Sequence, residues 1–427
     1  MKSKSRIFCS FAIALTFSLT ATAQKALRLE DCRQQAIDNY PLIRQYDLVE
    51  KARQYSLENI AKSYLPQLNL NAQGTYQTEV TKLNLDASAL PAALKIPSVS
   101  KDQYKATLDV TQLIWDGGAI SAQKRITEAN SEVDKQRIQV NLYAVKGTVN
   151  ELFFGILAID EQLKIIALTE QNLLSNKKML ESMMKNGVAM QSEMDQLDVE
   201  LLNLAQNRIE QNSLRKSYLS MLGLFIHQEL TDNTPLEKPI GMYDANEEVA
   251  RPELQLYHLQ IELMKKQNSA IEVKNMPKLG LFAQGGYGRP GLNMMEDKFK
   301  LFAQGGIKLT WNFGGLYTKK NEQRLIANNI SSIETEKETF LFNTRLEMTK
   351  EQQEIDKMKE LMKKDDAVIR LRERVKTAGE SRYKNGTYQM NELIRDINNE
   401  ALARQTKALH EIQYLKNIES YKQTLGK

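Results

Sequence analysis

The sequence contains very little cysteine, histidine and tryptophan. Among 427 residues there are two cysteines, three histidines and two tryptophans. Cys9 falls in an N-terminal segment that we expect to be removed, so Cys32 would have no partner for an internal disulfide. His227, His258 and His410 are scattered, with no cysteine or carboxylate at metal-ligand spacing. We therefore expect no disulfide scaffold, metal, cofactor or catalytic site.

Long apolar runs are also missing, except near the N-terminus. Three basic residues in the first six positions precede an apolar stretch at 7–19, which ends at Ala21-Thr22-Ala23. This pattern predicts a signal peptide at 1–23, because the apolar stretch is too short to span a bilayer. Without later apolar helices, any crossing of a membrane would use β-strands.

No excess of charge of one sign remains after the expected cleavage. The formal net charge is +5, and the predicted signal peptide carries three basic and no acidic residues. A mature chain close to neutral argues against nucleic-acid binding, which needs a concentrated basic surface.

Internal repetition is the most informative feature that is present. Three segments recur about 211 residues further along the chain, and a single offset for all three indicates duplication. The pairs are 41–46 with 252–257, 65–68 with 276–279, and 72–76 with 283–287. We therefore divide the mature chain into a first repeat at 24–227, a linker or equatorial segment at 228–250, and a second repeat at 251–427.

Each repeat predicts the same elements in the same order. Alternating polar and apolar residues predict two strands, and heptad spacing predicts a very long helix with a shorter returning helix. The expected helices are 41–64, 118–187, 188–225, 252–276, 315–386 and 387–426. The expected strands are 67–76, 104–115, 278–287 and 301–311.

Glycine pairs mark the passage from strand to long helix. Gly117 and Gly118 follow one tryptophan, and Gly314 and Gly315 follow the other. No Gly-Lys-Ser/Thr follows either pair, so we interpret both as strand-to-helix bends and not as phosphate loops.

The lengths of the expected helices predict a cylinder whose helical wall has an even height. A long helix of about 68 residues would span about 100 Å. In each repeat, the short helix (41–64 or 252–276) and the returning helix (188–225 or 387–426), stacked end to end, would have nearly the same length. Four strands are too few to close a barrel, since small barrels need about eight. The chain is therefore expected to oligomerise.

These features resemble the TolC-like outer-membrane efflux protein family. The segments that carry the resemblance are 29–31, 39–41, 64–68, 115–118 and 382–386. The resemblance implies a mainly α protein with membrane β: a TolC-like homotrimer with an α-helical coiled-coil tunnel and a 12-stranded β-barrel, four strands per chain. It also implies a barrel in the lipid of the outer membrane of a Gram-negative cell and a tunnel in the periplasm. The implied partners are a periplasmic adaptor and an inner-membrane efflux pump or ABC exporter.

The resemblance also assigns roles to the turns that precede the two returning helices and to the first residues of these helices. Gly187 and Gly386 would be the tips where an adaptor docks. The acidic residues just beyond them would form the periplasmic aperture: Glu193, Asp195, Glu392 and Asp396. Ordinary solvated helix charge is the alternative for these acids.

The function predicted from the sequence is a passive exit duct of a tripartite efflux or type I secretion system. A periplasmic coiled-coil adaptor of the membrane-fusion type is the main alternative, because adaptors also contain a long helical hairpin. The duplicated order of helix, two strands and long helix favours the duct. The cargo and the particular pump are not predicted.

Overall fold

The computed structural model describes residues 26–80, 99–242 and 248–427. The predicted signal peptide and part of the 228–250 connector lie outside these ranges. The chain forms two compact units, and each draws on both repeats. One unit, which we call the helical unit, comprises the described residues up to Ala36, Thr148–Met242 and Met358–Lys416. The other, which we call the sheet unit, comprises the described parts of Ile37–Gly147, Tyr243–Lys357 and Asn417–Lys427. Within the described ranges, no helix has the length and apolar character needed to cross a membrane.

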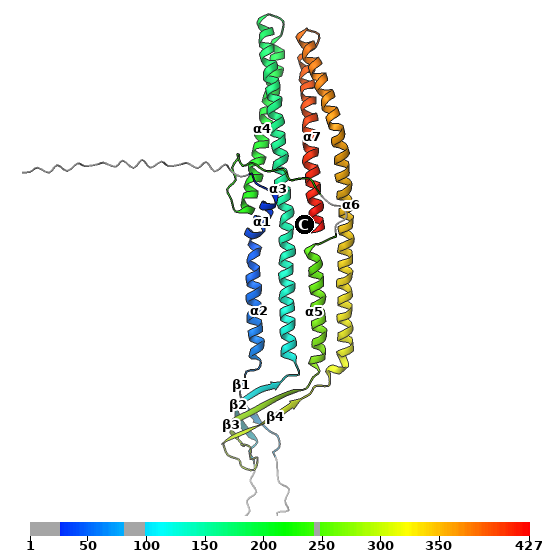
Figure 1. Ribbon diagram of the computed structural model, residues 1–427. Coiled ribbons are helices and arrows are strands. Elements are labelled where there is room, and N and C mark those ends of the chain that lie inside the picture. The colour runs from blue at the N-terminus through cyan, green and yellow to red at the C-terminus, as the bar shows by residue number, and fades with distance from the viewer. Residues whose placement is uncertain (1–25, 81–98, 243–247) are drawn as a thin grey trace, which may run out of the picture. The chain divides into compact units, whose positions relative to one another are not determined.

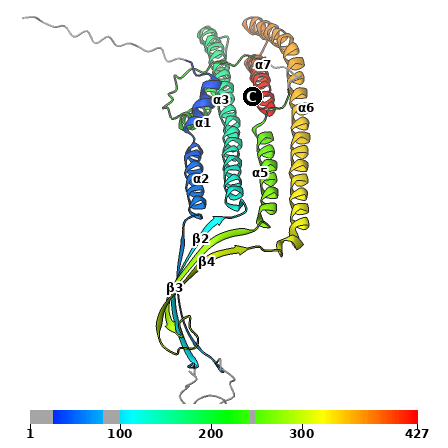
Figure 2. The same cartoon turned by 60° about the horizontal axis from the view of Figure 1, so that its bottom comes forward.

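The sheet unit contains one antiparallel sheet of four strands in the order β1-β2-β3-β4 (Figures 1 and 2). The strands are β1 (Gln67–Tyr76), β2 (Asp102–Trp115), β3 (Lys278–Arg289) and β4 (Lys300–Thr310). All four predicted strands are confirmed, each ending within two residues of its expected bounds. The repeats therefore contribute adjacent strand pairs to a single sheet.

The register of the sheet separates polar from apolar side chains. Asn69, Asp109, Gln284 and Gln304 lie directly opposite one another across the four strands and define the polar face. Side chains alternate between the two faces of a strand, so the intervening residues form the apolar face. The apolar face carries Leu68, Leu70, Leu108, Val110, Leu281, Ala283, Leu301, Ile307 and Leu309.

Helices continue from the strands in the same order. They are α2 (Gln45–Lys62), α3 (Ala119–Lys185), α5 (Pro252–Lys274) and α6 (Gly315–Lys384). Lys135 of α3 pairs with Glu50 of α2 at 2.9 Å, and Gln136 of α3 donates to the carbonyl of Pro252 at 2.9 Å. The rings of Tyr257 in α5 and Phe340 in α6 lie 6.0 Å apart. Within this unit the helices therefore follow the row α2-α3-α5-α6.

The expected helix at 41–64 differs in its first turn. Residues Pro41–Arg44 form a short 3-10 helix, η1, and the α-helix begins only at Gln45. Pro41 has no N–H to donate, and Ile43 bonds back to Tyr40 in the tighter i to i−3 pattern.

The helical unit contains α4 (Gln191–Ile226) and most of α7 (Met390–Leu425), together with the C-terminal parts of α3 and α6. It also begins with a helix that the sequence did not predict, α1 (Leu29–Asn39). Only Leu29, Cys32 and Ala36 of α1 are buried, so its apolar stripe is short. Burial raises the pKa of the Cys32 thiol to about 12.

The predicted heptad seam is confirmed more clearly in α3 than in α6. In α3 the seam has eleven positions, of which only Leu163 is half-buried. The ten buried ones are Ile138, Leu142, Val145, Val149, Leu152, Ile156, Ile159, Ile166, Leu173 and Leu180. In α6, Ile355 is buried while Leu341, Met348, Met362 and Ile369 are half-buried. The difference fits the position of α6 at the end of its row, where one side has no neighbour among the described residues of the sheet unit.

Candidate functional site

The helical unit has two hairpins, α3–α4 and α6–α7, which turn at Gly187 and Gly386. Both glycines have φ of +71°, in the left-handed region that L side chains rarely adopt. A Cβ at either position would meet nothing within 4 Å, so the requirement for glycine is conformational and not steric. The sequence placed these turns correctly, and their role in docking remains a prediction.

Glu193 and Glu392 occupy equivalent places at the starts of α4 and α7. Glu193 Oε2 accepts the N–H of Met190 at 3.0 Å, and Glu392 Oε2 accepts the N–H of Gln389 at 3.1 Å. Each is the third residue after the residue that caps its helix, where a glutamate side chain is long enough to reach back. This geometry gives a physical reason for glutamate at both positions.

The two aspartates of the predicted aperture differ in their surroundings. Asp195 is exposed and accepts a hydrogen bond from Gln191 at 2.8 Å. Asp396 is only 6% exposed; its Oδ2 accepts the Tyr388 hydroxyl at 2.8 Å and lies close to Gly379. The structure therefore places Asp195 on the surface and Asp396 in the packing of its own hairpin.

One predicted acid also links the hairpins. The Tyr383 hydroxyl of α6 donates to Glu193 Oε1 of α4 at 3.3 Å. Farther from the tips, Asn398 of α7 donates to Glu200 of α4 at 2.8 Å. Burial and the neighbouring Glu193 carboxylate raise the pKa of the Tyr383 phenol. Glu193 thus uses one oxygen for its own helix and the other for the opposite hairpin.

An apolar cluster lies beneath these polar links. It joins all four helices of the two hairpins and contains Leu173, Leu180, Met194, Leu197, Tyr383, Met390, Leu393 and Ile397. Because every hairpin helix contributes, the hairpins pack as one body near their turns.

The tyrosines on either side of Gly386 were not among the predicted site residues. Tyr388 donates to Asp396, which raises the pKa of its phenol, and the guanidinium of Arg382 lies 4.5 Å from its ring centre. Counted from Gly187, the equivalent places hold Met184 and Ala189. This difference between the repeats was the available signal for both tyrosines.

A groove lies beside these contacts, between the starts of α4 and α7. Its volume is about 380 Å³, and it is lined by Asp195, Gln196, Val199, Asn391 and Ile394. A carboxylate beside two aliphatic side chains suits the binding of a side chain from another protein. It offers no nucleophile with an adjacent base.

The predicted glycine bends lie between strand and helix in the sheet unit. Asp116 accepts the N–H groups of Gly118 at 2.9 Å and Ile120 at 2.5 Å, which caps the start of α3. Gly117 has φ of +70° and Gly118 of +93°.

The bend at Gly314 and Gly315, between β4 and α6, has a different geometry. Asn312 accepts the N–H of Gly314 at 2.9 Å, and Gly315 begins α6. Neither Gly314 nor Gly315 has a positive φ.

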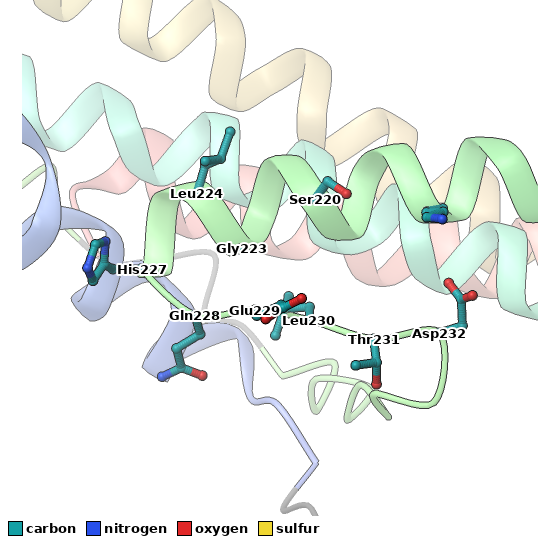
Figure 3. A pocket seen from close by; sticks show the side chains of 10 residues that line it. Ser220, Gly223, Leu224, His227, Gln228, Glu229, Leu230, Thr231 and Asp232 are labelled. Carbon is teal, nitrogen blue, oxygen red and sulfur yellow. The ribbon is translucent and has the colours of Figure 1, made fainter.

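A further cavity, of about 610 Å³, lies where α4 ends (Figure 3). His227 ends the helix with φ of 55°, and residues 228–232 run back along it. Gly223 permits this return, because a Cβ there would lie 2.5 Å from the carbonyl oxygen of Gln228. In the described part of the chain, no group of three or more His, Cys, Asp or Glu is placed to hold a metal ion.

Comparison with known proteins agrees with this architecture. Residues 32–221 match the family model described as outer membrane efflux protein. Among curated proteins, none matches the chain in sequence.

Several solved outer-membrane channels share the fold. The outer-membrane channel OprN is 15% identical with a TM-score of 0.66, and the match covers 93% of this chain and 89% of that one. Vibrio cholerae VceC is 13% identical with a TM-score of 0.64, covering 93% and 94%. Campylobacter jejuni CmeC is 14% identical with a TM-score of 0.62, covering 93% and 85%.

The fold is therefore that of the TolC-like outer-membrane channels, with two internal repeats in the chain. Together with the match at 32–221, it makes the chain similar to the outer membrane efflux proteins. The predicted channel class and outer-membrane location agree with this match and with the shared fold. The adaptor alternative is not supported.

Proposed function

We propose that the chain is one third of a homotrimeric exit duct that works with a periplasmic adaptor and an inner-membrane efflux pump or ABC exporter. Cargo leaves passively through the tunnel, and the inner-membrane partner supplies the energy. The observation that carries the proposal is the four-stranded sheet with one exposed apolar face and two edges without a neighbour in the described chain.

The apolar face of the sheet is suited to lipid. Leu70 is 79% exposed and Leu301 is 83% exposed, at opposite edges of the sheet. An exposed apolar face backed by a polar one is the pattern of a membrane strand whose other side faces water. Three such sheets joined edge to edge, β4 to the next β1, would close a barrel of twelve strands.

The helices of the sheet unit support the same cyclic closure. Helix α2 contains no buried residue, and Leu48 and Tyr55 are exposed on it. At the other end of the row, α6 exposes Leu325, Phe342 and Leu346. Apolar side chains on the first and last helices of the row would be covered by α6 of one protomer against α2 of the next.

The hairpin turns are the proposed entrance. Glu193, Asp195 and Glu392 would repeat around the threefold axis, where carboxylates favour cations and repel one another. The Tyr383–Glu193 bond fastens the two hairpins of each chain beside these acids. The groove beside Asp195 would receive the adaptor, and Gly187 and Gly386 shape the tips that present it.

A matched pair of arginine substitutions tests the assignment of the sheet faces. Leu70→Arg places a charge in lipid and is expected to cost about 2–4 kcal/mol, whereas Asn69→Arg on the polar face should assemble normally. Trimer yield on unheated gels and conductance in planar bilayers give the readout. A detergent-free soluble monomer, or equal tolerance of both substitutions, would contradict the duct.

The partners are tested separately from the pore. A photo-crosslinking residue at Val188, which is exposed beside the Gly187 turn, should capture an adaptor in cells. The same residue at Leu48 on α2 should instead capture a second copy of the chain. Capture of only the chain itself at both positions would contradict adaptor docking at the tips.

A further inference from the structure

A row of hydrogen-bonded polar side chains crosses all four strands of the sheet at one level. It contains Asn71 of β1, Asp109 of β2, Gln284 of β3 and Gln304 of β4. The register places Asp109, Gln284 and Gln304 directly opposite one another, and Asn71 lies two residues along β1 from Asn69, the residue opposite Asp109. Because these side chains share the polar face, the proposed closed trimer would place three symmetry-related copies of the row on the lumen wall.

Asp109 is the centre of this row. Its Oδ2 accepts Asn71 Nδ2 at 2.6 Å and Thr107 Oγ1 at 3.2 Å, and its Oδ1 accepts Gln284 Nε2 at 2.5 Å. Gln304 in turn donates to Gln284 at 2.7 Å. Every donor of the row is thus oriented directly or indirectly by one carboxylate.

The carboxylate keeps capacity for a further partner. An ionised carboxylate offers about four acceptor positions, and three are used here. Asp109 is half-buried, while its neighbour Thr107 is buried. The network therefore fixes the carboxylate without covering it.

The surroundings of Asp109 on the polar face include aromatic rings and lysines. Phe302 packs over Gly286 and Phe282 over Gly306. Lys105 lies with its amine 5.1 Å from the centre of the Phe302 ring and is not among the hydrogen-bond donors to Asp109.

The charges on this face alternate along the strands. The register places Lys105 on one side of the row and Lys308 on the other, so the acidic level lies between two basic levels. A cation passing along this face would be attracted at the level of Asp109 and repelled on either side of it.

We propose that Asp109 forms a ring of carboxylates on the lumen wall of the trimer and that this ring binds cationic groups, such as amines, of passing cargo. The inference rests on the proposed function, because it needs the closed trimer with the polar face inward. It assigns a binding position within the strands, remote in sequence from the acids at the hairpin turns.

Reversal potentials in a KCl gradient across a planar bilayer test the ring. Asp109→Asn removes the charge and keeps the shape and the acceptor oxygen. At about 0.1 M salt we expect the ratio of cation to anion permeability to fall about twofold or more, and the difference to fade near 1 M, where the screening length shortens from about 10 Å to about 3 Å.

Two variants on the same face complete the test. Lys308→Gln should shift the permeability ratio in the opposite direction. Gln304→Glu, which replaces the donor to Gln284 by a carboxylate, should raise cation preference at the level of Asp109. Gln304→Glu also provides the readout if Asp109→Asn fails to assemble. Spermine, used as a cationic probe, should block the wild type at lower concentration than Asp109→Asn.

The outcomes separate this inference from the proposed function. Conducting wild-type trimers with the same permeability ratio and spermine block in Asp109→Asn would overturn the ring and leave the duct intact. A fall in trimer thermal stability alone, with unchanged selectivity, would assign Asp109 a structural role and overturn the ring as well. A wild type that forms no conducting trimer would overturn both.

Discussion

The two hairpin turns share a backbone but differ in the side chains around it. Both turn at a glycine with φ of +71°, and both have a glutamate that bonds back to the start of the returning helix. Around Gly386 two tyrosines bind carboxylates, whereas Met184 and Ala189 hold the equivalent places around Gly187. The duplication thus retained the turn and its cap while the contacts diverged.

The divergence makes the connection between the hairpins asymmetric. The second hairpin supplies the Tyr383 hydroxyl, and the first supplies the Glu193 carboxylate that receives it. Apolar packing, in contrast, is shared, because both hairpins contribute fully buried leucines to one cluster. Stability should therefore depend on both hairpins about equally, while the side-chain donors of both polar links between them, Tyr383 and Asn398, come from the second.

The largest expected effect comes from the shared packing. Leu197→Ala and Leu393→Ala each remove a fully buried side chain, one from each hairpin, and should lower the free energy of unfolding by about 2–5 kcal/mol. Leu202→Ala, at a position 65% exposed, is the control and should change it by less than about 0.5 kcal/mol. Thermal unfolding followed by circular dichroism measures all three. A much smaller loss for Leu197→Ala would show that the core belongs to the second hairpin alone.

A smaller effect is expected from the tyrosine hydroxyls. Tyr388→Phe leaves the buried Asp396 without that donor and should cost about 1–3 kcal/mol, whereas Tyr383→Phe should cost about 1 kcal/mol because Glu193 keeps its bond to Met190. Tyr383→Phe should nevertheless raise single-channel conductance more, since it releases one hairpin from the other. The reverse order of conductance effects would contradict the asymmetry.

The last predicted effect depends on pH and concerns another difference between the repeats. Aligned on the two glycines, Glu351 of α6 corresponds to the buried Leu152 of α3. Burial raises the pKa of Glu351 from 4.5 to about 7, partly offset by a hydrogen bond from Thr424. The folded state therefore holds a proton that the unfolded state has released, and the free energy of unfolding falls as pH rises from 4.5 to about 7.

Glu351→Gln should remove this decline. Its melting temperature should exceed that of the wild type at about pH 8 and match it more closely near pH 5. Glu354→Gln, a neighbouring helix position that pairs with Lys357, is the control. An identical pH profile for wild type and Glu351→Gln would show that Glu351 titrates as an ordinary glutamate.

The elements with strong periodicity were predictable from the sequence. Alternation over ten or more residues located the strands, as Gln67–Tyr76 illustrates, and the heptads of α3 placed its buried seam. Helix α1 was not predicted, because three buried residues among eleven give too weak a helical periodicity of apolar residues. The 3-10 turn at Pro41–Arg44 was not predicted, because the sequence signals for the start of a helix do not distinguish a first turn of 3-10 helix from one of α-helix.

The candidate site was predictable in position but not in contacts. The glycines located the turns, and the acids beyond them were evident from their spacing. Asp396 is buried and Asp195 is exposed because of the way the hairpin helices pack against one another. The heptad pattern of a single helix does not specify this packing. Tyr383, which donates to Glu193, lies 190 positions away along the chain, and Gln284, which donates to Asp109, lies 175 positions away. Local sequence patterns do not reveal such contacts.

The two edges of the sheet have a consequence for biogenesis. A newly exported chain exposes the unpaired N–H and C=O groups of its edge strands, β1 and β4. It also exposes the apolar face of the sheet to water. Such a chain is prone to pair with any extended strand before it meets two copies of itself. We expect maturation to depend steeply on the local concentration of chains, so that at low expression a holding factor, rather than the fold itself, determines how many reach the membrane.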